Sequence, residues 1–204
     1  MKIYENPDLI LASKSPRRKY LLEKTGLRVN IIPSNVDESD FKPTPPKSYV
    51  KILSCAKARN ISDQNPDNWV LGADTIVVIN GTVLGKPKDE NQARRMLQML
   101  SGRKHQVFTG FTLSHQARAE QFTDVIVTDV FFKHLSADEI DWYIATGEPF
   151  DKAGAYAIQG IGTFLIKKIN GSYTNVIGLP VCEVMEFLIK KGVTRKNLPL
   201  PSVK

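Results

Sequence analysis

The sequence predicts an α/β protein with a mixed, twisted sheet and flanking helices. Short apolar runs alternate with amphipathic stretches along its 204 residues, an order typical of α/β folds. Asn80-Gly81 is a strong hairpin signal between two apolar runs, so some neighbouring strands are antiparallel and the sheet is mixed. Hydrophobic residues make up 42% of the chain, and its length suits one domain or two small lobes sharing a cleft.

The first predicted elements are a strand, a helix and a second strand. A buried apolar run predicts a strand at 9–12. Ser13 or Ser15 then caps a helix that begins at Pro16 and ends at Gly26, because proline suits the first helical position and glycine follows the last. The next elements are a strand at 29–33, a polar, proline-rich loop at 34–46 and a helix at 47–62.

The middle of the chain predicts a strand, a hairpin and an amphipathic helix. A short strand begins at Trp69, reaches Gly72 and ends in Ala73-Asp74-Thr75. Residues 76–79 continue extended into the Asn80-Gly81 turn, 82–84 return, and Gly85-Lys86-Pro87 closes the hairpin. The helix spans 89–100.

The second half predicts two long strands and two helices around an irregular segment. Ser136 and Glu139 have the spacing of a capping box, which starts a helix. The glycine-rich segment 147–162 has no clear period. The predicted elements are strands at 106–114, 121–132 and 163–169, helices at 136–146 and 180–191, and a loose tail at 193–204.

Composition narrows the classes of function. The net charge of +7 suits nucleic acid, a membrane surface or an anionic small substrate. No apolar run is long enough to span a bilayer and the N-terminus lacks the apolar core of a signal peptide, so we expect a cytoplasmic protein. Cys55 and Cys182 form no CxxC and are expected to be buried. The histidines lack metal-ligand spacing and are expected at the surface or in loops: His105, His115 and His134.

The stretch SKSPRR joins the first strand to the first helix. A helix N-terminus offers free N–H groups and partial positive charge, which suit phosphate. Ser13 and Ser15 add hydroxyl donors, and Arg17 and Arg18 add guanidinium groups that bind phosphate bidentately. The plainer interpretation is a capped helix with a basic, solvated first turn. Arginine there opposes the helix dipole, which favours a bound anion.

Three charged residues at turns or in a loop are further candidates. Asp74, in GADT, follows an apolar strand, where open α/β sheets bind ligands, and a carboxylate there can hold a divalent metal or act as a general base. Lys86, in LGKP, lies on a bend whose shape is fixed locally. Glu38, on the polar loop, is a possible second metal carboxylate. Singly, each has a plainer interpretation: a turn-capping aspartate, a solvated lysine and a surface glutamate.

Two glycine-containing segments complete the set. DKAGAYAIQG, at 151–160, has small residues that let a loop approach a ligand closely, and Gln159 offers the donors and acceptors needed to read a base edge. Asp151 and Lys152 pair with each other or reach phosphate. GSYTNVIGLP, at 171–180, is assigned a structural role.

Together these stretches resemble the Maf family of nucleoside triphosphate pyrophosphatases. The match runs in order along nearly the whole chain: SKSPRR, VDE at 36–38, AKA at 56–58, GADT, LGKP, LSGR at 100–103, DKAGAYAIQG and GSYTNVIGLP. The resemblance implies a single Maf-like domain over 1–204, similar to the ITPase fold, with two lobes around a central cleft. It also implies a divalent cation, Mg²⁺ or Mn²⁺, and a homodimer.

The resemblance assigns roles residue by residue. Asp74 looks like the family's proton acceptor, and Arg17, Thr75 and Gln159 match its substrate-selecting positions. The family's phosphate-binding and catalytic polar positions correspond to Ser13, Arg18, Lys57 and Lys86, and its loop carboxylate to Glu38. DKAGAYAIQG resembles the branch that hydrolyses dTTP and UTP, whereas a sister branch acting on 7-methyl-GTP lacks this pattern.

These assignments lead to one mechanism and two alternatives. Water attacks the α-phosphorus of dTTP or UTP, a metal is held by Asp74 and Glu38, and the products are a monophosphate and pyrophosphate. One alternative is 7-methyl-GTP or a modified pyrimidine nucleotide as substrate. The other is a non-enzymatic, basic nucleic-acid-binding protein. Stacking aromatics are missing near Arg17 except for Tyr20, which is expected in the core of the helix, so we expect no nucleic-acid partner. We expect no membrane partner either.

Overall fold

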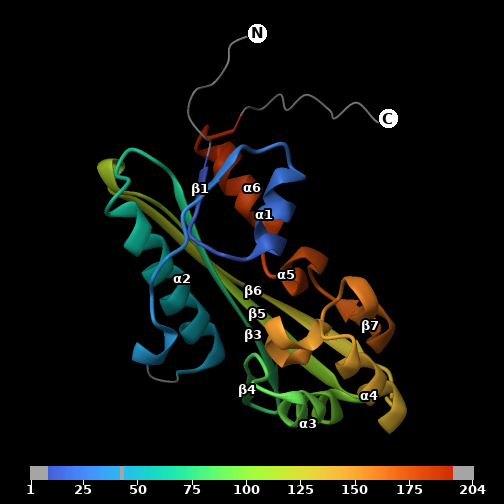
Figure 1. Cartoon of the computed structure of the whole chain (residues 1–204). Helices are drawn as coiled ribbons and strands as arrows, with labels where there is room; N and C mark the ends of the chain where they lie inside the picture. Colours follow the sequence, from blue (N-terminus) through green and yellow to red (C-terminus); the bar gives the residue numbers. More distant parts are fainter. Residues whose placement is uncertain (1–8, 42–43, 195–204) are drawn as a thin grey trace.

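The computed structural model describes residues 9–41 and 44–194 (Figure 1). Its seven-stranded sheet has the order β2-β1-β3-β5-β6-β7, and β4 pairs with β3. The strands are β1 (Leu9–Leu11), β2 (Val29–Ile31), β3 (Val70–Ile79), β4 (Thr82–Leu84), β5 (Lys104–His115), β6 (Glu120–Phe132) and β7 (Ile166–Asn170). β1 is parallel to β2 and β3 and the remaining pairs are antiparallel, so the predicted mixed α/β sheet is confirmed.

Helices flank the sheet on both faces and at both ends. They are α1 (Pro16–Glu23), α2 (Pro46–Ser62), α3 (Glu90–Leu100), α4 (Ala137–Ala145), α5 (Tyr173–Ile177) and α6 (Val181–Lys190). Figure 1 shows α2 along the long strands, α1 and α6 beside β1, and α3 and α4 at the opposite end. Among the described residues, no helix combines the length and apolarity that crossing a membrane would need.

Local sequence signals form as predicted at three element boundaries. Pro16 is the first residue of α1, and the Ser15 side chain accepts a hydrogen bond from the Arg18 backbone N–H. Ser136 caps α4 in a complete capping box. Asn80 and Gly81 both have positive φ, as the tight turn between β3 and β4 requires.

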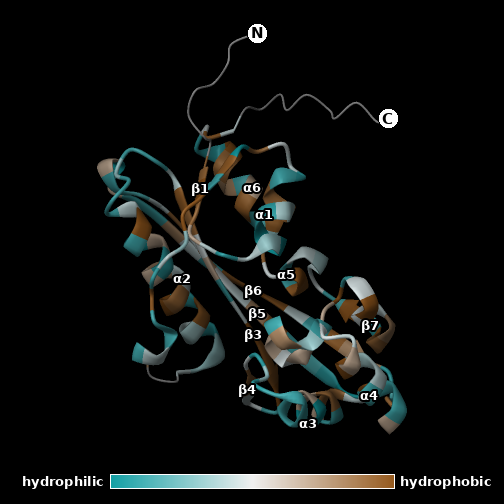
Figure 2. Ribbon diagram, in the orientation of Figure 1, coloured by the Kyte–Doolittle hydropathy of each residue, from teal (hydrophilic) through white to brown (hydrophobic). Residues whose placement is uncertain are grey.

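Two hydrophobic cores share the long strands. Leu71 and Ala73 of β3 belong to a core with β1, α1 and α6, and Figure 2 shows the hydrophobic colour on β1 and much of α6. Val77 and Ile79 of the same strand belong to a second core with α3 and α4. Asp74 and Thr75 lie between these two pairs, so two polar side chains separate the apolar ones. Ile76 points to the face of Asp74 and joins a third apolar cluster with Val50, Val78 and Phe108.

Helix α2 packs unusually close to the sheet because two facing strand positions are glycine. A Cβ at Gly72 would lie 2.4 Å from the Ser54 carbonyl oxygen, and a Cβ at Gly110 would lie 2.3 Å from that of Val50. Any larger residue at either position would push the helix away. Asp74 pairs in register with Gly110, so the close approach brings α2 directly over Asp74.

Several sequence-based expectations were wrong in detail. The strand predicted to end at Ala73-Asp74-Thr75 and the extended segment predicted at 76–79 form one continuous strand, β3, because its partner β5 pairs with it across nearly the whole length. The predicted turn at 171–180 contains the short helix α5. The strand predicted at 163–169 begins at Ile166, after a 3-10 segment. Most of the predicted loose tail, 195–204, lies outside the described residues, while Val193 packs against the core.

The histidine and cysteine expectations were also partly wrong. His105 and His115 are buried, Cys182 is exposed and Cys55 is only partly buried. Tyr20, which was expected in the core, is 50% exposed. His105 Nε2 lies 2.8 Å from the Tyr156 hydroxyl, and its ring packs edge-on against Phe132. Burial lowers the pKa of His105 to about 4.

The buried histidine predicts acid sensitivity. Between about pH 6.5 and pH 4 the unfolded chain binds a proton at His105 that the folded chain excludes, so the free energy of unfolding falls as the pH falls, by up to about 3 kcal/mol. Urea unfolding at pH 7.5 and pH 4.5 should show a smaller loss for His105→Gln than for the wild type. The exposed His134→Gln is the matched control. Equal losses in wild type and His105→Gln would contradict this origin.

Candidate functional site

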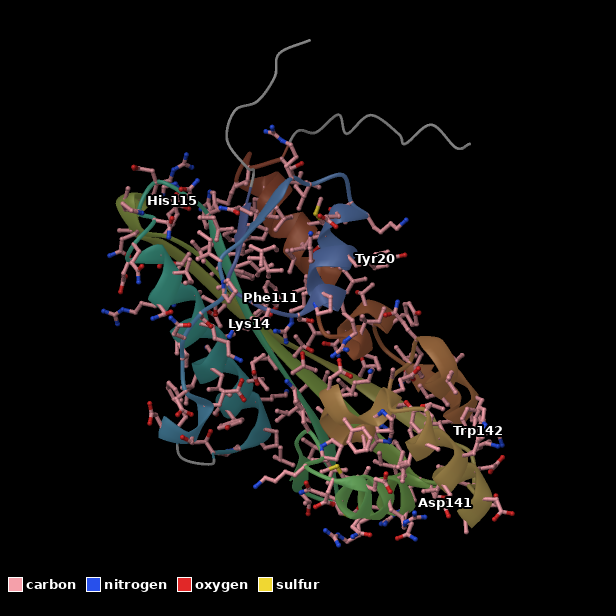
Figure 3. All side chains as sticks on the ribbon, in the orientation of Figure 1. Lys14, Tyr20, Phe111, His115, Asp141 and Trp142 are labelled. Atoms are coloured by element: carbon pink, nitrogen blue, oxygen red, sulfur yellow. The ribbon has the colours of Figure 1, made fainter. Side chains whose placement is uncertain are left out.

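The site forms where one edge of β3 lacks a partner strand. β1 pairs with β3 at Val70 and Leu71, and β4 pairs with it only from Val77. Asp74, Thr75 and other residues between these pairings line a cleft of about 710 Å³. Figure 3 shows Lys14, another lining residue, between α2 and the lobe that contains α1. The cleft therefore lies between the two hydrophobic cores.

Asp74 and Glu38 meet at a single lysine. Lys57 Nζ on α2 lies 2.7 Å from Asp74 Oδ1 and 2.7 Å from Glu38 Oε1. The Asp74 side chain is 8% exposed and that of Lys57 11%, whereas that of Glu38 is 58% exposed. Lysine compensates a buried carboxylate that would otherwise be costly, and it holds the loop of Glu38 over the cleft.

The two carboxylates are suitable ligands for a small divalent cation. Mg²⁺ prefers oxygen ligands, keeps several waters and needs only one or two protein carboxylates besides substrate phosphate. Lys57 contacts one oxygen of each carboxylate, so Asp74 Oδ2 and Glu38 Oε2 are not used by this contact. No group of three metal-ligating side chains occurs within 9–41 and 44–194, so the donor set fits a cation shared with a substrate and not a closed protein site.

Arg18 joins three parts of the site. Its Nε donates to the Gly178 carbonyl at 2.8 Å, one terminal nitrogen donates to Ala73 and Ser13, and the other donates to the Thr75 hydroxyl at 3.1 Å. Burial lowers the pKa of Arg18, and the charge of Asp74 opposes that effect. Four of the five N–H groups of the guanidinium are thus engaged by the protein, which leaves one for phosphate.

Arg17 crosses the cleft to the opposite lobe. Its guanidinium lies 2.7 Å from Asp151 Oδ2, on the 3-10 turn Glu148–Asp151, and Lys152 also pairs with Asp151. The predicted Asp151–Lys152 pair therefore forms, and Arg17 joins it. Since Asp151 is 61% exposed, a polyanion can compete with it for the Arg17 guanidinium.

The remaining predicted residues divide between the cleft and an adjoining pocket. Ser13 and Lys86 line the cleft, and Lys86 is exposed. Gln159 lies outside the cleft, in a pocket of about 50 Å³ that shares Arg17 and Thr75 with it. The other residues lining this pocket are mostly apolar: Val77, Val107, Ala153, Tyr156, Ala157, Ile158, Val176 and Ile177, together with Lys152.

Thr75 faces away from Asp74. Successive side chains of a strand point to opposite faces, so Asp74 meets α2 while Thr75 meets Arg18 on the other face. The Thr75 hydroxyl also lies 2.9 Å from that of Thr109. Thr75 lines both the cleft and the small pocket, and Thr109 holds its hydroxyl from behind.

Two residues lining the cleft had not been singled out in the sequence. Tyr49 on α2 has a pKa raised mainly by burial and also by the charges of Asp74 and Glu38. No pattern in the sequence marks it, because its neighbours in space are distant in the chain. Lys14 could have been found, since it lies inside SKSPRR.

Comparisons with known proteins identify relatives over nearly the whole chain. The family model for Maf-like protein matches residues 8–191. The dTTP/UTP pyrophosphatase of Syntrophus aciditrophicus is 50% identical over 184 residues, covering 90% of this chain and 90% of that protein. The dTTP/UTP pyrophosphatase of Geotalea uraniireducens is 48% identical over 185 residues, covering 91% of this chain and 95% of that protein.

Solved structures support the fold. The Ham1 protein of Staphylococcus aureus superposes with a TM-score of 0.54 at 13% identity, covering 90% of this chain and 98% of that one. At this identity the likeness concerns the fold alone, and it confirms the predicted fold class. Because the family model spans nearly the whole chain and relatives share about half of its residues, this chain belongs to the Maf family.

Proposed function

We propose that the protein is a pyrophosphatase that hydrolyses dTTP and UTP to the monophosphate and pyrophosphate. The observation that carries the proposal is the buried Asp74, held with Glu38 by Lys57, in a cleft edged by cationic side chains. The names of the relatives that share about half of the sequence support the substrate class. The cytoplasmic location, the homodimer and the exclusion of nucleic acid as a partner stay predictions.

The triphosphate chain would bind along the cationic side of the cleft. Ser15 and the N-terminus of α1 line it, together with Arg17 and Lys86 from opposite lobes. Phosphoryl transfer depends on positioning and on neutralising charge, which these groups supply. Arg17 would exchange Asp151 for phosphate, and Arg18 would hold Ser13 and β3 in place while offering its remaining N–H.

Asp74 would accept the proton of the attacking water. Its carboxylate lies at the open edge of β3, and Lys57 fixes its orientation through Oδ1. Oδ2 has two lone pairs, so it would accept a hydrogen bond from the water that attacks the α-phosphorus and would still have a lone pair for the cation. Lys57 is thus expected to act mainly by orienting Asp74. It would bind phosphate only where a phosphate oxygen comes within hydrogen-bond distance of Nζ.

Asp74 and Glu38 would hold the divalent cation, Mg²⁺ or Mn²⁺, at the cleft. The cation would supply charge neutralisation for the phosphate chain and lower the pKa of a bound water. Both carboxylates already meet at Lys57, so their positions need little change.

Base selection would take place in the small pocket beside the cleft. Gln159 and apolar side chains line it, and its volume of about 50 Å³ suits part of a single ring. Gln159 would pair with the polar edge of uracil or thymine, and a base with the wrong donors would leave buried polar groups unpaired. Thr75 would orient Arg18 at the boundary of the two spaces.

Replacing Asp74 tests the chemistry. Asp74→Asn keeps the shape and removes the proton acceptor, so pyrophosphate release from dTTP and UTP with Mg²⁺ or Mn²⁺ should fall by about 10²–10⁴-fold. Asp151→Asn is the matched control, because Asp151 contacts Arg17 and not the attacking water, and it should keep most of the activity. A loss of less than tenfold in Asp74→Asn would contradict its role.

Replacing Lys57 tests the cation site without an activity assay. Lys57→Met leaves Asp74 without its counter-charge and should lower the free energy of unfolding by about 3 kcal/mol in metal-free buffer. Adding Mn²⁺ should raise the melting temperature of Lys57→Met more than that of the wild type or of the exposed control Lys51→Met, because the metal replaces the ammonium. An equal Mn²⁺ effect on all three proteins would argue against this site.

A panel of nucleoside triphosphates tests the substrate class. Wild type should release pyrophosphate from dTTP and UTP much faster than from 7-methyl-GTP. Gln159→Ala should reduce the ratio of these rates by about tenfold. Preference for 7-methyl-GTP would keep the chemistry and overturn the substrate. Release from no triphosphate, with salt-sensitive binding of single-stranded RNA, would favour the nucleic-acid alternative.

A further inference from the structure

We propose that Tyr143, Glu148 and Thr163 form a brace that positions Gln159 and so determines base selectivity without touching the substrate. These three residues are called the Gln159 brace below. The inference rests on the proposed function, because it concerns how the same enzyme chooses its base. None of the three lines the cleft or the small pocket, so they would be positioning residues.

Glu148 and Tyr143 hold the loop on both sides of Gln159. The Ile161 N–H donates to Glu148 Oε2 at 3.0 Å, and the Gly162 N–H donates to Glu148 Oε1 at 2.9 Å. The Tyr143 hydroxyl donates to the same Oε1 at 2.8 Å and accepts the Ala157 N–H at 3.2 Å. One carboxylate and one hydroxyl thus fix three backbone N–H groups that flank Gln159.

Thr163 holds the two carbonyl groups next to Gln159. Its hydroxyl lies 3.0 Å from the Ile158 oxygen and 2.8 Å from the Gly160 oxygen. These two residues are the immediate neighbours of Gln159 in the chain. The backbone on both sides of Gln159 is therefore held in place, which fixes the point from which its side chain extends.

The loop packs so closely against the brace that two of its positions have no space for a Cβ atom. Gly160 has a φ of +70°, and a Cβ there would lie 2.6 Å from Glu148 Oε2. A Cβ at Gly162 would lie 2.6 Å from the Tyr143 hydroxyl. Both glycines are needed for the backbone to reach the two side chains, which explains the glycine content of this segment better than substrate contact does.

The brace stands on a rigid support. Tyr143 is fully buried on α4, whereas its neighbours Asp141 and Trp142 lie at the outer end of this lobe (Figure 3). Burial, together with its hydrogen bond to Glu148, raises the pKa of Tyr143, so its hydroxyl keeps its proton and remains a donor. Base selectivity depends on the geometry of the hydrogen bonds between Gln159 and the base. A buried residue that holds the loop keeps Gln159 in the position that this geometry needs.

The test compares substrates within each enzyme preparation. For wild type, Glu148→Gln and Tyr143→Phe, kcat/KM is measured for UTP and for GTP, and the UTP/GTP ratio is taken. Glu148→Gln places an amide NH₂ against a backbone N–H, so the ratio should fall about tenfold or more, chiefly through UTP. Glu139→Gln, which lies on α4 with Tyr143 but outside the brace, should leave the ratio unchanged.

Thr163 is exposed, so a substitution there should destabilise the fold less than one at the buried Tyr143. Thr163→Val removes the one hydroxyl proton that lies within reach of both carbonyl oxygens and should lower the ratio about threefold, whereas Thr163→Ser keeps the hydroxyl and should retain the wild-type ratio. A merely structural role would reduce turnover of both substrates equally and leave the ratio unmoved. Unchanged ratios in active variants would overturn the inference alone. A wild type that releases no pyrophosphate would overturn the proposed function and the inference with it.

Discussion

The contact of the Lys57 ammonium with Asp74 and Glu38 is the interaction on which the site depends. An aspartate on the buried face of a sheet is costly unless a counter-charge lies beside it. Helix α2 supplies that charge, and it can do so only because Gly72 and Gly110 let it lie close to the sheet. These residues therefore depend on one another. The two glycines let α2 approach the sheet, Lys57 extends from α2, and its charge stabilises the Asp74 carboxylate.

The open edge of β3 turns that unit into a site. β1 leaves the strand after Leu71 and β4 joins it at Val77, so a polar stretch lies between two apolar cores. The ends of the two lobes face each other across this gap. Arg18 stabilises the gap from one side by binding the backbone carbonyls of Ala73 and Gly178, whereas Arg17, within the described part of the chain, pairs only with Asp151, an exposed residue across the gap.

Local sequence patterns predicted most of the fold, but they did not predict the contacts between residues that are distant in the chain. The Pro16 start, the Ser136 capping box and the Asn80-Gly81 turn each depend on neighbouring residues, and all formed as predicted. The continuous β3 and the burial of His105 depend on strand pairing and packing that no local pattern contains. The same limit applies to the site: motifs identified Asp74 and Lys57 separately, but only the fold joins them to Tyr49 or separates Gln159 into its own pocket.

The central claim is that this cleft directs water to the α-phosphorus of a nucleoside triphosphate. Hydrolysis of UTP in water labelled with oxygen-18, followed by mass spectrometry of both products, tests it most directly. Attack at the α-phosphorus breaks the bond between the α-phosphorus and the bridging oxygen, so the label should appear in UMP and not in pyrophosphate. Label in pyrophosphate would mean attack at the β-phosphorus and would contradict the placement of Asp74 and its water.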